Sequence, residues 1–262
     1  MNLLDTYHHY ITEVADRRTN IHPLISSPVP ILLISAAYLY YVLDYGPRYM
    51  KNKQPYSLKT FIFWYNVFQI CINLYMIYLT YEAGWFGDGF LFCTELDYSY
   101  NDKPMKIIAM LLLGLNVKIS DYIETIVFVL RKKDRQVSFL HLYHHVSTVL
   151  LSWYTVKYFP NGYAVMVGFV NSIIHIIMYS YYLLTSYGPE MQKMLAPFKP
   201  ILTTCQMVQF VVLITYLMQA FIPGCPEMQY FAGIMIINLL INFVLFYNFY
   251  RQNYTLSKNK KK

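Results

Sequence analysis

The chain has 262 residues, of which 56% are hydrophobic and only 13% are charged, whereas a soluble domain has about a quarter charged residues. Its net charge of +7 does not indicate a nucleic-acid partner, because the basic residues occur in short runs between long apolar segments. The first thirty residues contain no apolar run, so no cleavable signal is expected. The composition predicts an integral membrane protein.

Seven apolar segments are long enough to span a bilayer, which takes about 20 residues per helix. These helices are expected at 28–45, 61–82, 105–130, 137–157, 162–184, 200–222 and 228–250. Pro23, Pro28 and Pro30 should break any helix that precedes the first segment. No repeat or linker divides the chain, so residues 1–262 are predicted to form one all-α domain.

The loops between the segments predict the orientation in the membrane. Basic residues dominate the loops 46–60 and 131–136 and the tail 251–262, whereas the loop 83–104 is acidic. Since basic loops stay in the cytosol, the segment 1–27 is expected on the lumenal side and the tail on the cytosolic side. An odd number of crossings agrees with this orientation.

The four cysteines fall in two environments under this topology. Cys71 and Cys205 lie in predicted helices, whereas Cys93 and Cys225 lie in two loops on the lumenal side. Disulfides persist in an oxidising lumen, so a Cys93–Cys225 bridge is predicted, with two free thiols as the alternative.

Polar and ionisable residues recur inside four of the predicted spans. Each ionisable group costs about 2.5–3.5 kcal/mol there on insertion scales and usually marks a functional site. These residues are Lys118, Asp121, Glu124 and Thr125; His141, His144 and His145; Asn171, His175, Tyr179 and Tyr182; and Thr203, Gln206 and Gln209.

The spacing of these residues predicts one shared site. His141, His144 and His145 follow the i, i+3, i+4 pattern, so their rings lie on one helical face. Counted at about 1.5 Å per helical residue from the loop ends, the four helices hold their polar groups at a similar depth, in the cytosolic half. Buried amides also join helices, and the stripe of Asn66, Gln69 and Asn73 is not assigned to the site.

Four sequence blocks occur in the order found in one enzyme family. They are G-P-R-Y-M at 46–50, H-L-Y-H-H at 141–145, N-S-I-I-H-I-I-M-Y-S-Y-Y at 171–182, and Thr203 with Gln206 and Gln209. From about residue 23 to residue 250 the chain resembles the very-long-chain fatty acid elongase (ELO) family. A fifth block, with Lys118, Asp121, Glu124 and Thr125, departs from the family pattern, because the aspartate and the glutamate exchange their usual order.

The resemblance implies a fold, a location and a reaction. The second to seventh helices would form a barrel around a closed acyl tunnel, in a multi-pass protein of the endoplasmic reticulum membrane. The enzyme would be an acyltransferase, a 3-oxoacyl-CoA synthase. It would condense acyl-CoA with malonyl-CoA to give 3-oxoacyl-CoA, CO₂ and CoA, beside the other enzymes of the elongation cycle.

The resemblance also implies roles for the site residues. His144 would be the nucleophile that forms an acyl-imidazole, and His175 would stabilise the oxyanion or enolate. His141 and His145 would orient the rings, and Asn171 would donate a hydrogen bond. The remaining polar residues are expected to shape the site: Lys118, Asp121, Glu124, Thr125, Tyr179, Tyr182, Gln206 and Gln209.

The CoA phosphates are expected at the basic cytosolic loops. Arg48, Arg131, Lys132 and Arg135 are the candidate contacts, since guanidinium and ammonium groups bind phosphate strongly. The alternative is that these residues only set the topology.

A di-iron enzyme and an enzyme with a single metal ion are two alternatives to a metal-free enzyme. Membrane di-iron desaturases also use an H-x-x-H-H box, but only four of the seven histidines here lie in predicted spans, too few for two metals. A single metal held by these four histidines stays an alternative, although no metal and no bound cofactor are expected. A seven-helix receptor or a lipid carrier would not need this constellation.

Overall fold

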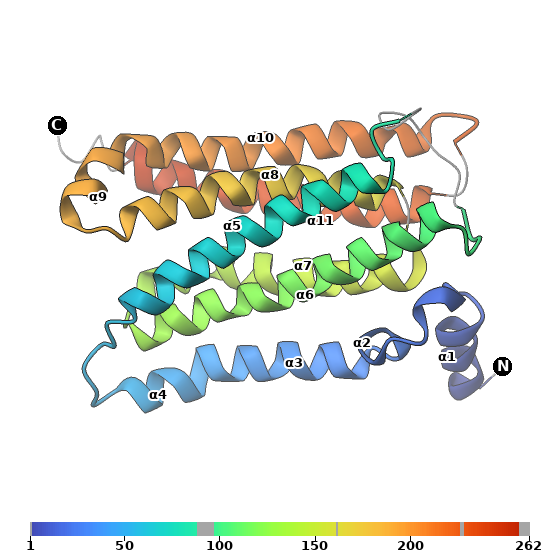
Figure 1. Ribbon diagram of the computed structural model, residues 1–262. Helices are drawn as coiled ribbons and strands as arrows, with labels where there is room; N and C mark the ends of the chain where they lie inside the picture. The colour runs from blue at the N-terminus through green and yellow to red at the C-terminus, as the bar shows by residue number, and fades with distance from the viewer. Residues whose placement is uncertain (1, 88–96, 161, 226–227, 257–262) are drawn as a thin grey trace.

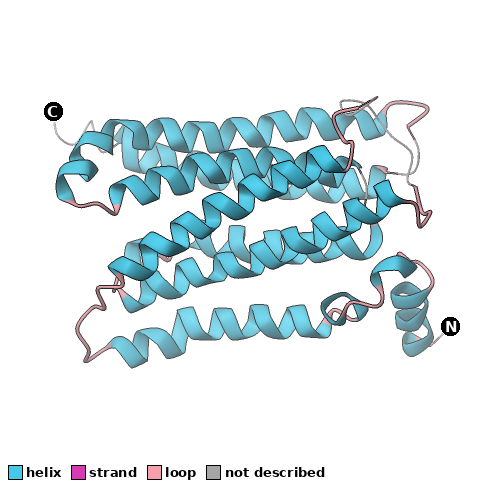
Figure 2. Ribbon diagram, in the orientation of Figure 1, coloured by secondary structure: helices cyan, strands magenta, loops and turns pink. Residues whose placement is uncertain are grey.

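The computed structural model describes residues 2–87, 97–160, 162–225 and 228–256, and every regular element among them is helical (Figure 1, Figure 2). The α-helices are α1 (Leu3–Thr12), α2 (Pro23–Ser26), α3 (Val29–Tyr40), α4 (Gly46–Met50), α5 (Lys59–Glu82), α6 (Asp102–Leu130), α7 (Phe139–Tyr158), α8 (Gly162–Thr185), α9 (Pro189–Leu195), α10 (Lys199–Leu217) and α11 (Gln229–Tyr250). Short 3-10 turns are η1 (Arg17–Thr19), η3 (Asp134–Gln136), η4 (Ala196–Phe198) and η5 (Met218–Phe221), and π-helical turns are η2 (Tyr41–Tyr45) and η6 (Arg251–Thr255).

Five helical runs in the described part of the chain are long and apolar enough to cross a membrane. They are Val29–Met50, Lys59–Glu82, Gly162–Thr185, Pro189–Phe221 and Gln229–Thr255. The chain is therefore an all-α membrane protein. Helices α6 and α7 are also long, with 29 and 20 residues, but they carry most of the charged and histidine residues of the expected site. The count of seven spans stays a prediction.

The N-terminal segment contains two helices, α1 and α2, before the first long run. Helix α1 begins with a capping box, in which the Asn2 side chain accepts from the Asp5 amide and the Asp5 carboxylate accepts from the Asn2 amide. Helix α2 begins at Pro23, where the missing amide proton costs nothing. Helix α2 ends at Ser26, and Ser27 before Pro28 is extended, so the predicted break before the first long run is confirmed.

A glycine–proline pair lets the first long run approach α6 closely. A Cβ atom at Gly46 would lie 2.8 Å from Val129 Cγ1 of α6 and 2.7 Å from the Tyr41 carbonyl oxygen, so only glycine fits there. Pro47 cannot donate a backbone hydrogen bond, and the π-helical turn η2 directly precedes this pair. The pair therefore places α4 next to the end of α6.

Six helices form a closed ring of neighbours. In the order α5, α8, α10, α11, α7 and α6, each helix packs against the next, and α6 packs against α5. Helix α3 lies outside this ring against α7, and α4 packs against α6. The two chain termini lie at opposite ends of the bundle (Figure 1). We refer to these ends by the helix found there, as the α1 end and the α9 end.

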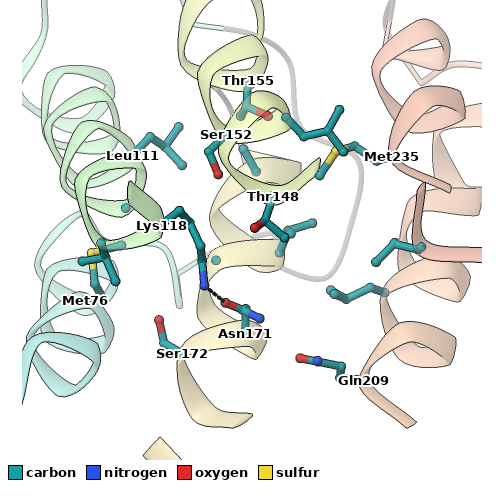
Figure 3. Close-up of a pocket in the computed structure, with 18 of the residues that line it drawn as sticks. Met76, Leu111, Lys118, Thr148, Ser152, Thr155, Asn171, Ser172, Gln209 and Met235 are labelled. Atoms are coloured by element: carbon teal, nitrogen blue, oxygen red, sulfur yellow. Dashed lines mark hydrogen bonds between the residues drawn. The ribbon is translucent and has the colours of Figure 1, made fainter. Parts of the chain in front are cut away.

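A cavity of about 130 Å³ lies inside the ring and is lined by residues of all six helices. Along α7 the lining extends from His144 to Thr155, a rise of roughly 16 Å. On the side of the α9 end the wall includes polar groups, among them Lys118 and Asn171. On the side of the α1 end it is mostly apolar, with residues such as Leu111 and Met235 (Figure 3).

A second group of buried charges lies at the α1 end, here called the N-terminal cluster (Asp16, Arg18, Asn20 and Lys157). Arg18 pairs with Asp16 at 2.6 Å between Nη2 and Oδ2, with side-chain exposures of 3% and 1%. The Arg18 Nη1 donates to the carbonyl oxygens of Asp97 and Ser99 at 2.8 and 2.7 Å. The N-terminal segment is therefore fastened to the residues before α6.

The same cluster also fastens the N-terminal segment to α7. The Lys157 ammonium donates to Asn20 Oδ1 at 2.5 Å, and the Asp16 amide donates to the Lys157 carbonyl at 2.9 Å. Next to this cluster, hydrogen bonds from the Ser99 side chain and amide hold the pKa of the exposed Asp97 carboxyl below its ordinary value. Every charge of this cluster has a partner.

Candidate active site

The histidine triplet lies on the first two turns of α7. The Ser138 side chain caps this helix and accepts from the His141 amide, so the triplet starts directly after the basic α6–α7 loop. The rings of His141 and His145 are 4.1 Å apart between centroids, and those of His144 and His145 are 5.9 Å apart. The structure thus brings the three rings together as the spacing predicts, and among them His144 lines the cavity.

His144 is held by an amide of α11 that sequence reasoning did not single out. His144 Nδ1 lies 3.1 Å from Asn242 Oδ1, and Asn242 Nδ2 donates to the backbone carbonyl of Asn238 at 2.9 Å. Asn242 is 1% exposed. The nearest signal in the sequence is an asparagine pair spaced i, i+4 in an apolar helix, a pattern that also occurs in ordinary helix packing.

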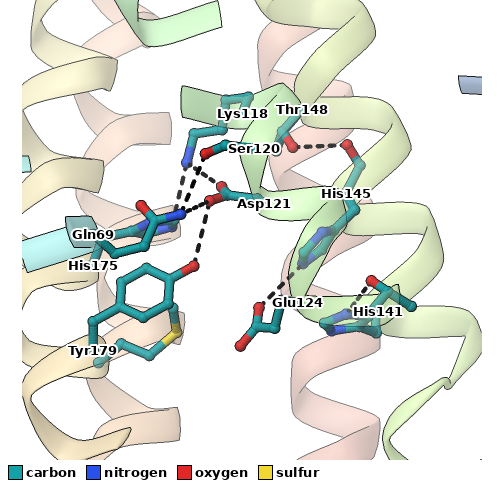
Figure 4. Close-up of polar contacts among 12 residues, drawn as sticks. Gln69, Lys118, Ser120, Asp121, Glu124, His141, His145, Thr148, His175 and Tyr179 are labelled. Atoms are coloured by element: carbon teal, nitrogen blue, oxygen red, sulfur yellow. Dashed lines mark hydrogen bonds and ion pairs between the residues drawn. The ribbon is translucent and has the colours of Figure 1, made fainter. Parts of the chain in front are cut away.

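Lys118 joins α6 to α8 at the polar end of the cavity. Its ammonium donates to Asn171 Oδ1 at 2.7 Å and to Asp121 Oδ2 at 3.3 Å, and its Nζ lies 3.3 Å from His175 Nε2 (Figure 3, Figure 4). An ammonium group has three protons, so these three partners satisfy it. The contacts bring together four of the residues that the sequence assigned to one site.

Asp121 is surrounded by donors from three helices. Besides Lys118, its Oδ1 accepts from Gln69 Nε2 at 2.9 Å and from the Tyr179 hydroxyl at 3.3 Å (Figure 4). Gln69 of α5 therefore belongs to the site, although its sequence stripe was left unassigned. Asn73 of the same stripe lines the cavity. Both residues share a face of α5 because they are four positions apart.

Glu124 and Thr125 contact the two histidines beside the nucleophile candidate. Glu124 Oε2 is 3.8 Å from His145 Nε2, and Thr125 Oγ1 is 2.9 Å from His141 Nε2. The Tyr38 hydroxyl of α3 bonds the same threonine at 2.8 Å. These contacts explain how the helix outside the ring supports the orientation of His141.

Glu124, His141 and His145 also form a group that could hold a metal ion. One ligand atom from each lies within 4.8 Å of the others, and carboxylate with imidazole is a common ligand set. His141 Nε2 is already bonded to Thr125, so this nitrogen would have to leave that partner. The expectation of no metal stays a prediction.

Several buried polar atoms near the cavity have no partner in the described part of the chain. Among them are the Nδ1 atoms of His145 and His175 and the Oε1 atoms of Gln69 and Gln209. Buried polar atoms are normally paired, so such atoms suit a polar ligand. Of the other predicted residues, Gln206 turns to the Met178 sulfur at 3.4 Å and Tyr182 packs edge-on against Tyr179.

The predicted CoA contacts lie at the α9 end, in two adjacent loops. The Lys132 ammonium donates to the Lys51 carbonyl at 3.3 Å, which joins the α4–α5 and α6–α7 loops. Arg48 is exposed and pairs with Asp44. Hydrogen bonding to Tyr49 raises the pKa of the Lys53 ammonium. Arg131 is half-buried and Arg135 is exposed in the same region.

The predicted disulfide pair is only partly within the structure. Cys71 and Cys205 carry free thiols. The Cys225 sulfur lies 3.2 Å from the Tyr163 hydroxyl, whereas Cys93 lies outside the described residues. Cys225 is disulfide-bonded, as predicted, and its pairing with Cys93 stays a prediction.

Comparison with known proteins shows the family of the chain. The family model of the ELO (GNS1/SUR4) family matches residues 23–262. A very long chain fatty acid elongase of Aedes aegypti is 34% identical over 262 residues, covering 100% of this chain and 73% of its own length. The human very long chain fatty acid elongases 1 and 4 are 35% and 36% identical, covering 93% and 97% of this chain and 88% and 81% of their own lengths. The chain therefore belongs to the ELO family.

Proposed function

We propose that this protein elongates very-long-chain fatty acids by condensing an acyl-CoA with malonyl-CoA. The observation that carries the proposal is the position of His144, which lines the polar part of the cavity. An acyl chain would occupy the apolar part, which the hydrophobic effect favours, and its thioester would then lie next to the imidazole. The curated relatives are named as elongases of the same class.

In the first half-reaction His144 is the nucleophile. A ring nitrogen forms a bond to the thioester carbonyl carbon, the carbon–sulfur bond breaks, and CoA leaves as a thiolate that takes a proton from solvent. The oxyanion that develops needs a donor in a low-dielectric site. His175 Nδ1 is the candidate, because its Nε2 faces the Lys118 ammonium and its Nδ1 has no partner among the described groups.

In the second half-reaction malonyl-CoA supplies the carbon nucleophile. Its carbon–carboxylate bond breaks to release CO₂, and the electron pair of that bond forms an enolate. The enolate carbon bonds to the acyl carbon while the carbon–nitrogen bond to His144 breaks, which gives 3-oxoacyl-CoA and restores the imidazole. Lys118, held by Asp121 and Asn171, would stabilise the negative charges of malonate and enolate.

The proposed reaction fits a specific topology and location. Seven crossings, α6 and α7 included, would make the ring of six helices a barrel around the acyl tunnel. The α9 end would face the cytosol, where its two basic loops would bind the CoA phosphates. The N-terminus would lie in the lumen of the endoplasmic reticulum, and the other enzymes of the elongation cycle would act on the product.

Elongation assays with labelled malonyl-CoA test this proposal. Purified protein is incubated with saturated acyl-CoAs from lauroyl to hexacosanoyl, and labelled CO₂ and 3-oxoacyl-CoA are measured. Both products should form in equal amounts, and full activity after chelation would agree with a metal-free reaction. Stoichiometric Zn or Fe with loss of activity on chelation would favour the metal alternative, and absence of condensation with every acyl-CoA would overturn the proposal.

A further inference from the structure

The Asn242 side chain makes two hydrogen bonds, one to His144 and one to a backbone carbonyl. The second bond shows which atom of the Asn242 amide faces His144. The Asn242 side chain bonds both the Asn238 backbone carbonyl and His144 Nδ1. A carbonyl oxygen only accepts hydrogen bonds, so the amide nitrogen of Asn242 must face it. The amide oxygen is then the atom that faces His144.

This orientation determines the tautomer of His144. An amide oxygen cannot donate, so the hydrogen in the 3.1 Å contact belongs to Nδ1. In a neutral imidazole the other nitrogen, Nε2, then carries the lone pair. Because His144 lines the cavity, the lone pair is available to a thioester bound there.

We infer that Asn242 is the positioning residue of the nucleophile, which holds His144 as the Nδ1-protonated tautomer through the whole reaction cycle. The inference rests on the proposed acyl transfer to His144. Asn242 also lines the cavity, and in this inference it acts on the reaction through the imidazole.

An uncharged acceptor suits the proton balance of this cycle. When Nε2 bonds to the acyl carbon, the ring becomes an acyl-imidazolium that keeps its Nδ1 proton. When the enolate takes the acyl group, the carbon–nitrogen electron pair returns to Nε2 and the neutral tautomer is restored. No proton leaves Nδ1, so the acceptor need not take one. A full negative charge there would stabilise the acyl-imidazolium and slow its breakdown.

Two variants of similar size test the role of the acceptor. Asn242→Leu removes the acceptor, whereas Asn242→Asp keeps an oxygen at the same position. Purified full-length variants are mixed with acyl-CoA without malonyl-CoA, and free CoA and the acyl adduct of the His144 peptide are followed by mass spectrometry. CoA release by Asn242→Leu should slow roughly 10- to 100-fold, as for loss of other histidine-orienting groups, with an unchanged KM for acyl-CoA.

The comparison of the two variants separates positioning from structural support. Asn242→Asp should release CoA nearly as fast as the wild type but turn over malonyl-CoA more slowly. Equal loss of CoA release in both variants, or normal release by Asn242→Leu, would overturn the inference. Asn248→Leu, an exposed position on the same helix, is the matched control for expression. Failure of the proposed function would instead be seen in the wild type, as absence of any condensation.

Discussion

The molecule contains two clusters of buried charged and polar residues, and only one of them borders the cavity. In the N-terminal cluster Arg18 and Asp16 form a buried ion pair, and Arg18 Nη1 donates to two backbone carbonyls. In the site cluster His144 and Lys118 line the cavity, and His175 keeps a buried nitrogen without a partner in the described part of the chain. Burial and charge alone therefore do not identify the active site. The site cluster differs from the N-terminal cluster in that His144 and Lys118 border the cavity.

The largest effect is expected from removal of the nucleophile in the site cluster. His144→Ala should lower the rate of condensation at least about a thousandfold, as removal of other catalytic nucleophiles does. Its unfolding midpoint should stay close to that of the wild type, because the imidazole faces a cavity. Elongation assays and thermal unfolding of the same preparation measure both quantities. Near-normal turnover would refute the nucleophile assignment.

The opposite pattern is expected for the N-terminal cluster. Arg18→Met leaves the Asp16 carboxylate buried without its guanidinium partner, which typically costs 3–5 kcal/mol. Stability should fall by about this amount, whereas turnover per folded molecule should not change. Arg17→Met is the matched control, since the neighbouring Arg17 is exposed and should change stability by less than about 0.5 kcal/mol. A large loss of turnover in folded Arg18→Met would show that the N-terminal cluster also contributes to catalysis, and would contradict the prediction.

An intermediate effect is expected from filling the apolar part of the cavity. Gly168 lines the cavity, and a Cβ atom there would meet no other atom within 4 Å. Gly168→Leu should shorten the acyl chains that are accepted, with a loss of roughly 10- to 100-fold in kcat/KM for the longest substrates. Short acyl-CoAs should react normally. Gly233→Leu is the control, because this glycine also has open space around it but is not a lining residue. An unchanged chain-length profile of Gly168→Leu would place the acyl chain elsewhere.

The smallest effect is expected from an exposed ion pair at the α9 end. Arg48 and Asp44 pair on the surface, and such pairs contribute about 0–1 kcal/mol. Arg48→Ala should leave stability unchanged and raise the KM for both CoA thioesters a few-fold, more at low salt than at high salt. Lys193→Ala, in another exposed pair with Glu190, should leave both KM values unchanged. Equal effects of the two substitutions would indicate a general surface charge effect instead of a CoA site.

Much of this description could be predicted from the sequence, because its physical basis is local. Apolar runs that match the bilayer thickness predict the long helices, and the i, i+3, i+4 spacing of His141, His144 and His145 predicts a shared face. The cost of ionisable groups in a membrane identifies Lys118 and Asp121 as unusual. These properties depend on neighbours within a few turns of the same helix.

The tertiary structure decided the properties that depend on distant residues. His144 and Asn242 are 98 positions apart, and Gln69 and Asp121 are 52 positions apart, so helical periodicity cannot pair them. The order of the helices in the ring determines which histidine lines the cavity. It also determines which buried charges lie at the α1 end, away from the cavity lining. An amide or a carboxylate is chemically the same group in the site cluster and in the N-terminal cluster. Its role depends on which donor, acceptor or cavity the fold places within hydrogen-bonding distance.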